Sequence, residues 1–291
     1  MRTLVLALLV TVAVGGCASA RSAPSAGVVD VVAAENSWGN IAAQIGGARV
    51  HVTSIIDDPQ ADPHLFDANA RAAAGIARAR LVVENGLGYD DQVHALLAGS
   101  DAKVLSVAKV LGVRRHDANP HLWYDVRRSG TVARAIADAL KQLDPAGAPE
   151  YDANVARFDA SLRPVLATID AIRRTYAGAP VAYTERVAGY LLDDAGLDVR
   201  TPAGFARSVE EGSEPNPRDT QAVDDLISRR AVRVLVYNAQ ATSSTTRRAQ
   251  QQAVAAHIPV VDVTETMPKA APSYQAWQLA QARALLGALG G

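Results

Sequence analysis

The chain of 291 residues contains a single cysteine, which excludes both a disulfide framework and any zinc or iron–sulfur site built from several cysteines. Aromatic residues make up 5% of the sequence, too few for the aromatic-lined platform that binds a sugar or a nucleobase. No run of Lys and Arg is longer than two residues, and 29 basic residues stand against 30 acidic ones, so we expect no nucleic-acid partner. The 49% of hydrophobic residues is enough for one large or two medium-sized α/β domains with a buried core.

The N-terminus has an apolar run, residues 3–14, after the basic residue Arg2. A transmembrane helix needs about 20 apolar residues, so this shorter run predicts an export signal over residues 1–16. Cys17 follows Val14-Gly15-Gly16 and resembles the lipobox cysteine of bacterial lipoproteins, with Val14 where leucine is usual. We therefore expect a lipidated tether over residues 17–27 and an extracytoplasmic protein anchored to the cell membrane. A signal peptide cut elsewhere, with an incidental buried Cys17, is the alternative.

Apolar runs typical of strands alternate with helical patterns along most of the chain. The strands are predicted at residues 28–33, 50–56, 81–84, 181–183, 232–237 and 259–263. The helices are predicted at residues 37–45, 68–79, 90–97, 126–143, 187–195, 218–229, 243–256 and 274–289. This alternation predicts an α/β fold in which mainly parallel sheets are flanked by helices.

The alternation stops between Pro149 and Tyr176, where apolar residues fall at helical spacing and no strand signal appears. The pattern predicts one long helix of roughly 40 Å at 1.5 Å per residue. Pro164 predicts a kink in this helix, unless the chain breaks there into two shorter helices. The expected organisation is thus an N-terminal lobe at 28–143, an interlobe helix within 144–178 and a C-terminal lobe at 179–291.

Two of the six histidines share a local context. His64 ends the triplet Asp62-Pro63-His64 and His121 ends Asn119-Pro120-His121, and an aromatic residue follows each closely. Both stretches precede a predicted helix, which is where α/β folds place ligand sites. A lone histidine is more often an ordinary surface or core residue, but the matched pair predicts that His64 and His121 bind the same metal ion. The remaining histidines have no such context and are expected at the surface: His51, His94, His116 and His257.

Taken together in chain order, these motifs resemble those of the metal-binding solute receptors of bacterial ABC importers for zinc, manganese or iron, the group with a rigid interlobe helix. The matching stretches are residues 36–42, 62–64, 79–88, 119–125 and 214–219. The resemblance implies four ligands, two from each lobe, of which the first two fall on His64 and His121. It places the third on Glu185, after the first strand of the second lobe, and the fourth on Glu265, beyond the last strand, with Asp262 as the fallback.

Solvated ion pairs are the alternative role for both carboxylates. Glu185 precedes Arg186, and Glu265 lies near Lys269, so on spacing alone each glutamate could simply face water beside a basic residue. The ligand roles of Glu185 and Glu265 therefore depend on the resemblance.

Two imidazoles and two carboxylates give a charge-neutral site for one divalent transition metal ion. Carboxylates can bind through one or two oxygens, which suits Mn²⁺ or Fe²⁺, while Zn²⁺ accepts the same donors at four-coordinate geometry. Zinc-type receptors usually have histidine in place of Glu185, and many carry a His-rich loop that this chain lacks, so the resemblance favours manganese without excluding zinc. The chain also has Tyr237-Asn238-Ala239-Gln240 where many members show Glu-Pro-Gln, which leaves the metal preference and the fourth ligand open.

The sequence thus predicts a monomeric, lipid-anchored receptor that is not an enzyme. It would capture Mn²⁺ or Zn²⁺ outside the cytoplasm and deliver the ion to the permease of an ABC importer. The alternative is an exported metal-dependent hydrolase, because His and Glu ligands also build catalytic zinc sites. Such sites usually carry paired histidines on one element, as in His-x-x-x-His, and the chain has no such pair.

Overall fold

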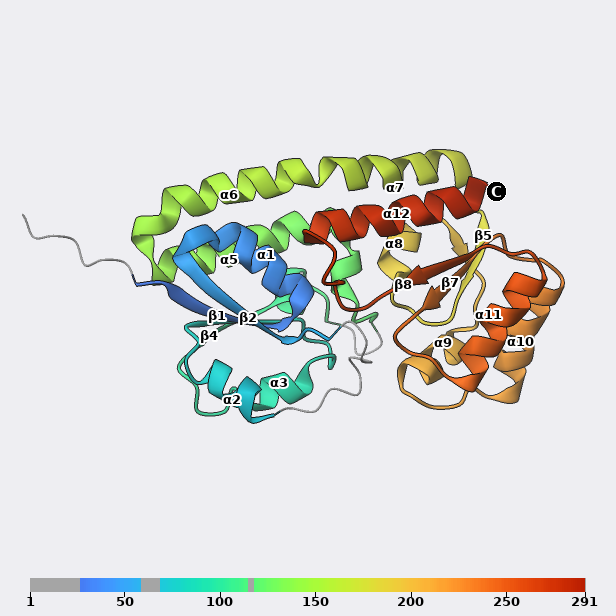
Figure 1. Ribbon diagram of the computed structural model, residues 1–291, viewed down its shortest axis with the longest axis horizontal. Coiled ribbons are helices and arrows are strands. Elements are labelled where there is room, and N and C mark those ends of the chain that lie inside the picture. The colour runs from blue at the N-terminus through green and yellow to red at the C-terminus, as the bar shows by residue number, and fades with distance from the viewer. Residues whose placement is uncertain (1–26, 59–68, 115–117, 291) are drawn as a thin grey trace, which may run out of the picture.

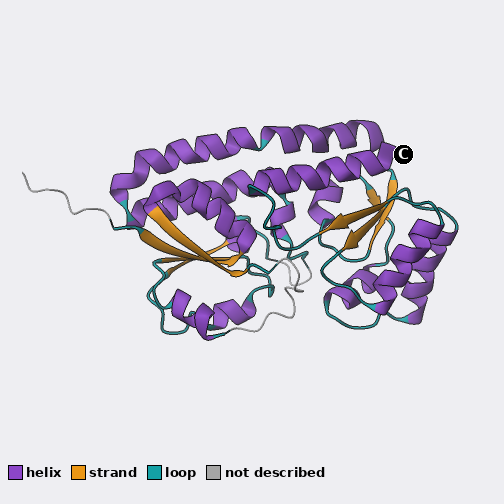
Figure 2. Cartoon of the chain, viewed as in Figure 1, coloured by secondary structure: helices purple, strands orange, loops and turns teal. Residues whose placement is uncertain are grey.

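The computed structural model describes residues 27–58, 69–114 and 118–290, which form two α/β lobes that lie side by side (Figure 1). Each lobe contains a four-stranded sheet in which every paired strand is parallel. Helices cover the sheets, as Figure 2 shows. The α/β class predicted from the alternation of strand and helix patterns is confirmed.

The first lobe has the strand order β2-β1-β3-β4. Its strands are β1 (Val29–Glu35), β2 (Val50–Ile56), β3 (Leu81–Glu84) and β4 (Lys103–Ser106). Its helices are α1 (Asn36–Gly46), α2 (Ala70–Ile76), α3 (Asp91–Ala95), α4 (Val107–Val110) and α5 (Ser129–Leu143). Central strand β1 is apolar on both faces because Val31 packs into the large core under α1 and α5 while Val32 packs against Ile76 of α2 and Val93 of α3.

The second lobe has the strand order β6-β5-β7-β8. Its strands are β5 (Pro180–Tyr183), β6 (Asp198–Val199), β7 (Leu235–Asn238) and β8 (Val260–Val263). Its helices are α8 (Gly189–Asp194), α9 (Ala203–Glu210), α10 (Pro217–Ser228), α11 (Ser244–Ala255) and α12 (Tyr274–Gly290). Local chemistry fixes where two of them begin: Asn216 accepts a hydrogen bond from the Asp219 amide with Pro217 at the first position of α10, and Ser243 exchanges bonds with Thr246 at the start of α11.

The connection between the lobes consists of two helices in line, α6 (Ala148–Ser161) and α7 (Arg163–Tyr176), with Leu162 between them. Pro164 stands at the first turn of α7, where its missing N–H costs no helical hydrogen bond. The sequence prediction left a kink or a break open at this proline, and the structure has the break, two residues earlier. Helix α12 returns beside α7 and also contacts α1, so it spans both lobes (Figure 1).

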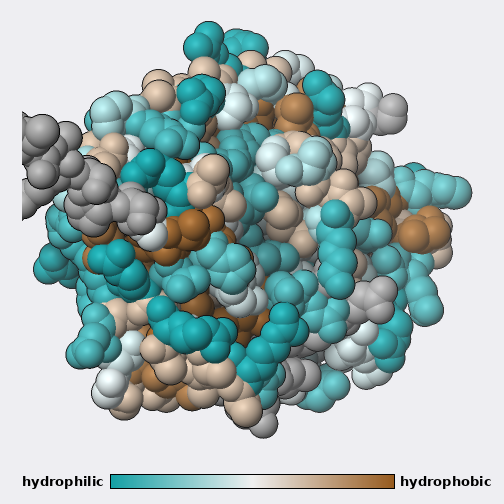
Figure 3. Space-filling view, turned by 60° about the vertical axis from the view of Figure 1, so that its left-hand side comes forward, coloured by the Kyte–Doolittle hydropathy of each residue, from teal (hydrophilic) through white to brown (hydrophobic). Residues whose placement is uncertain are grey.

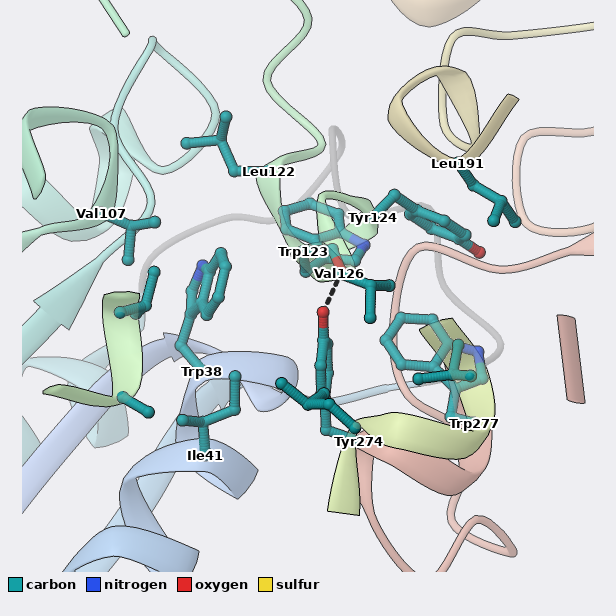
Figure 4. Packing of buried hydrophobic residues seen from close by; sticks show 14 of the residues in the cluster. Trp38, Ile41, Val107, Leu122, Trp123, Tyr124, Val126, Leu191, Tyr274 and Trp277 are labelled. Atoms are coloured by element: carbon teal, nitrogen blue, oxygen red, sulfur yellow. Dashed lines mark hydrogen bonds between the residues drawn. The ribbon is translucent and has the colours of Figure 1, made fainter. Parts of the chain in front are cut away.

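One apolar core runs through both lobes. It contains Val31 of β1 and Ile136 of α5 from the first lobe, and Val181 of β5 and Val261 of β8 from the second. At its centre the three tryptophans meet the tyrosines: Trp38 lies edge-on to Trp123, and the Tyr274 hydroxyl donates to the Trp123 carbonyl at 2.6 Å (Figure 4). Because Tyr274 opens α12 and Trp123 lies two residues after His121, this packing fixes the His121 loop against the second lobe.

Four short elements were not predicted: β4, α4, β6 and α9. The edge strand β6 has only two residues and carries Asp198, so it shows no apolar run. Strand β4 has only four residues, Lys-Val-Leu-Ser, which do not alternate between polar and apolar and are too few for a distinct period. Both strands lie at the edge of their sheets, where one neighbour supplies all the pairing.

The surface is mostly hydrophilic, with apolar residues in small separate patches on the face shown in Figure 3. Of the large apolar side chains in the described ranges, those that are exposed are Val28, Val104 and Val254. Within those same ranges, no helix combines the length and the apolar character that crossing a membrane requires.

Candidate metal centre

The two sheets direct their carboxyl ends toward each other, as the arrowheads in Figure 2 show. Loops that leave these ends carry three of the four predicted ligands: His121 from the first lobe, Glu185 after β5 and Glu265 after β8. In open α/β sheets this is the edge where ligands bind. His64 and Cys17 lie outside the described residues.

His121 is fully buried, and its neighbours fix the state of its ring. Its Nδ1 lies 2.7 Å from the side-chain oxygen of Asn119, which can only accept, so Nδ1 carries a hydrogen. Asn119 itself is oriented because its amide nitrogen donates to the Arg186 carbonyl at 2.6 Å. In the neutral imidazole the lone pair is therefore on Nε2, the nitrogen that faces Glu265 Oε2 at 3.2 Å. His121 Nε2 and Glu265 Oε2 are thus two electron-pair donors that face each other, an arrangement that suits a metal cation between them.

Glu185 and Glu265 are almost completely buried, with 2% and 1% exposed. One amide joins them: Asn238 Nδ2 donates to Glu265 Oε1 at 2.8 Å and also to Glu185 Oε2. The solvated ion-pair alternative is therefore wrong for Glu185, and Arg186 instead pairs with Glu210 at 2.6 Å. Burial removes the water that would otherwise screen the two carboxylates from each other.

Glu265 also contacts Tyr89 and Gln240, whereas the side chain of Asp262 is exposed. The Tyr89 hydroxyl donates to Glu265 Oε2 at 2.8 Å, and the Glu265 amide donates to the Gln240 side-chain oxygen at 2.6 Å. Asp262, the fallback for the fourth ligand, has an exposed side chain on β8. The structure thus brings His121, Glu185 and Glu265 together and leaves Asp262 out.

The loops that carry these side chains are tied across the boundary between the lobes. The Tyr124 hydroxyl of the first lobe donates to the carbonyl of Thr264, the residue before Glu265, at 2.7 Å. Asn36 at the start of α1 exchanges two hydrogen bonds of 2.9 Å with the backbone of Met267. Both ties lie within two residues of Glu265. Hydrogen bonds to the backbone therefore fix the distance between the ligand-bearing loop of the first lobe and that of the second.

Four residues of this site escaped the sequence prediction as functional residues: Tyr89, Asn119, Asn238 and Gln240. Asn119 stood inside the Pro-His motif, and Asn238 and Gln240 stood in the stretch that departs from the related receptors. Polar residues directly after a buried strand were the available signal for the second pair. Tyr89 gave no such sequence signal, because its ring packs against His121 and Trp123 as any core aromatic residue would.

No group of three or more His, Cys, Asp and Glu side chains in the described part of the chain is arranged to hold a metal ion as it stands. Glu265 Oε2 already faces His121 Nε2 at 3.2 Å, and Glu185 joins this pair through the Asn238 amide.

A second group of buried acids lies at the same edge of the first sheet. Glu35 ends β1 and Glu84 ends β3, with 2% and 4% exposed, and Asp90 stands nearby with 2% exposed. Burial, together with the charge of Asp90, raises the pKa of Glu35 well above its ordinary value, and neither carboxyl oxygen of Glu35 has a hydrogen-bond partner among the described residues. Burial also raises the pKa of Asp90 to about 6, although its carboxylate accepts the amides of Asn85 and Gly86.

Known proteins resemble this chain in sequence and in fold. A protein of Treponema pallidum named for metal binding is 25% identical over 260 residues, which is 81% of this chain and 79% of that protein. The manganese-binding lipoprotein MntA of Halalkalibacterium halodurans is 26% identical over 198 residues, 62% of this chain and 66% of that protein. The structure of the periplasmic zinc-binding protein TroA from Treponema pallidum has the same fold, with a TM-score of 0.74 at 20% identity over 89% of this chain and 98% of that chain. Residues 31–288 match the family described as zinc-uptake complex component A, periplasmic, and the chain belongs to that family.

Proposed function

We propose that this protein is an extracytoplasmic receptor that captures one divalent transition metal ion, Zn²⁺ or Mn²⁺, between its lobes and delivers it to an ABC importer. The observation that carries the proposal is that His121 and Glu185, from separate loops of the two lobes, both lie next to buried Glu265, His121 at 3.2 Å and Glu185 through the shared Asn238 amide. The family match over residues 31–288 supports a solute receptor over the exported hydrolase, which was the alternative.

The proposed ligands are His64, His121, Glu185 and Glu265. Two neutral imidazoles and two carboxylates compensate the charge of a divalent ion, so burial of the loaded site costs little electrostatic free energy. The hydrogen bond from Asn119 fixes the tautomer of His121 in advance, as partners of metal-bound histidines commonly do. Relatives named for zinc and for manganese both support a site of this kind.

Glu185→Ala is expected to weaken the binding of both metals by about 10- to 100-fold, because a water oxygen can replace part of what the carboxylate supplies. Glu185→His is expected to weaken Mn²⁺ much more than Zn²⁺, since it exchanges an anionic oxygen donor for a neutral nitrogen and favours tetrahedral binding. The measurement is calorimetric titration of both metals at one fixed pH, because protons compete for the ligands.

Glu211→Ala, at an exposed glutamate after α9, is the matched control and should bind as the wild type does. A wild type that binds neither metal would refute the receptor function. Unchanged affinities in Glu185→Ala would remove this residue from the ligand set, and equal losses of the two metals in Glu185→His would show that it does not set metal preference.

We also propose that Cys17 is lipidated and tethers the receptor to the cell membrane, next to the importer. The relative MntA is named a lipoprotein, which supports the motif. Cys17→Ser is expected to move the protein from the membrane fraction to the soluble fraction while its metal affinity stays unchanged, because residue 17 precedes the folded lobes. Cell fractionation with immunoblotting measures this, and Cys17→Ser protein that stays with the membrane would contradict the anchor.

A further inference from the structure

Helix α8 of the second lobe packs against the segment of the first lobe that carries His121. It contacts the one-turn helix Leu122–Tyr124, and in Figure 1 it lies at the boundary between the lobes. Asn119, two residues before His121, lies against the first residue of α8. This contact joins the second lobe to a proposed metal ligand through a residue that is not itself a ligand.

Asn119 is held from two sides by residues of the second lobe. Its amide nitrogen donates to the Arg186 carbonyl at 2.6 Å, and its backbone carbonyl accepts the Tyr190 hydroxyl at 2.9 Å. Its side-chain oxygen accepts from His121 twice, from the backbone N–H at 3.1 Å and from the ring Nδ1 at 2.7 Å. Because a carbonyl can only accept and a backbone N–H can only donate, these contacts fix the orientation of the Asn119 amide.

Gly189, the first residue of α8, leaves the space that this arrangement needs. Its backbone N–H donates at 2.8 Å to the Arg186 carbonyl, the same atom that accepts from Asn119, so the Asn119 amide lies directly against Gly189. A Cβ atom at position 189 would lie 2.6 Å from Asn119 Nδ2, well below the roughly 3.5–4.0 Å at which non-bonded heavy atoms pack. Gly189 has no positive φ, so its backbone would accept alanine, and among the described residues only Asn119 opposes the substitution.

Resting on the proposed function, we infer that Gly189 and Tyr190 are positioning residues that act through Asn119. They hold Asn119 where it keeps the hydrogen of the His121 ring on Nδ1 and the lone pair on Nε2. The other tautomer has a partner ready, because Glu265 Oε2 lies 3.2 Å from Nε2 and would accept a hydrogen from it. If Asn119 moved away, the hydrogen would shift to Nε2 and occupy the lone pair that a metal ion needs. The packing of the second lobe thereby controls whether a ligand of the first lobe is ready to bind.

The test is a double-mutant cycle between Gly189→Ala and Asn119→Ala, with the affinities for Zn²⁺ and Mn²⁺ measured by competition with a chelator of known affinity. Gly189→Ala is expected to lower both affinities by about 10-fold, because Asn119 must shift and release His121. In the Asn119→Ala background the collision is gone, so Gly189→Ala should cost no further affinity. Losses that multiply across the two substitutions would contradict the role of Asn119 as the link.

Gly130→Ala is the matched control and should bind both metals as the wild type does. Gly130 is a buried glycine of α5, and a Cβ atom there would collide with the carboxylate of Asp159, again the far end of a side chain. Tyr190→Phe tests the second contact, since it removes the hydroxyl and keeps the ring, and both affinities should fall by about threefold or more. Gly189→Ala and Tyr190→Phe proteins that bind as the Gly130→Ala protein does would overturn the inference.

A second measurement reads the ring of His121 in the metal-free protein at one fixed pH. Correlation spectra of ¹⁵N-labelled imidazole rings show which nitrogen carries the hydrogen, and the spectrum of His121→Ala identifies the signals of this ring. The hydrogen is expected on Nδ1 in the wild type and in Gly130→Ala, and on Nε2 in Gly189→Ala. Unchanged His121 signals in Gly189→Ala would refute the positioning role. Because these spectra involve no metal, a wild type that binds neither ion would refute the proposed function and leave this result standing.

Discussion

His121→Ala is expected to lower the affinity for Zn²⁺ and for Mn²⁺ by more than about 100-fold, beyond the loss typical of partners outside the ligand set. His121 is fully buried, and Asn119 already holds its ring in the tautomer that presents Nε2, so binding spends little entropy on ordering this ligand. Alanine leaves a buried space beside Glu265 in place of the nitrogen donor. Titration of both metals by competition measures the loss.

The control for this substitution is His51→Ala, at a histidine on β2 whose side chain is 70% exposed and pairs with Asp30. This variant should bind both metals as the wild type does. If His121→Ala kept affinity within about threefold of the wild type while remaining folded, the ion would have to bind elsewhere, and the site at the lobe boundary would be refuted.

Glu35→Gln is expected to raise the free energy of unfolding at pH 8 by about 1–3 kcal/mol. The reason is burial: the folded protein keeps the pKa of Glu35 well above its ordinary value, so ionising this carboxyl in the folded state is costly. Glutamine has nearly the same shape and cannot ionise. At pH 4, where glutamate is protonated in both the folded and the unfolded chain, the two proteins should differ little.

The direction in which wild-type stability changes with pH follows from proton binding by Glu35. Between the unfolded and the folded pKa, the folded state holds a proton that the unfolded state has lost, so wild-type stability falls as the pH rises through the folded pKa. Each unit by which the pKa is raised corresponds to about 1.4 kcal/mol at high pH. Urea unfolding at several pH values measures this, with the exposed Glu211→Gln as control. A stability difference between Glu35→Gln and wild type that does not grow from pH 4 to pH 8 would contradict the argument.

The fold was largely predictable because its signals are local. Strands β1 and β3 contain apolar runs, β2 alternates with a β period, and the helices around them carry apolar residues at helical spacing. The edge strand β6 could not be predicted, because it has only two residues, pairs on one side and shows no sequence pattern typical of a strand. The break at Leu162 was foreseen only as one of two outcomes, because a proline in the first turn of a helix and a proline inside a helix look alike in sequence.

The sequence predicted which side chains meet at the lobe boundary, and their role as metal ligands stays a prediction, but it did not predict the hydrogen bonds among them. Proline-histidine motifs and the resemblance pointed to His121, Glu185 and Glu265, and these three side chains do lie together. The contact of Tyr89 with Glu265 joins residues 176 positions apart, and that of Asn238 with Glu185 joins residues 53 apart. Such contacts depend on how two lobes pack and on which way an amide is turned, which no local pattern encodes.

The apolar core that both lobes share limits how a bound ion can leave the site between them. Residues from β1 and α5 share that core with residues from β5 and β8, so swinging the lobes apart would expose apolar surface to water. A motion that exposed about 200 Å² of it would cost about 5 kcal/mol, which leaves roughly one molecule in 5000 in the open form at any moment. Handing an ion to an importer through so rare a form would be slow. We therefore expect the ion to escape when the ligand-bearing loops loosen one by one, so that contact with the importer acts on those loops while the lobes keep their packing.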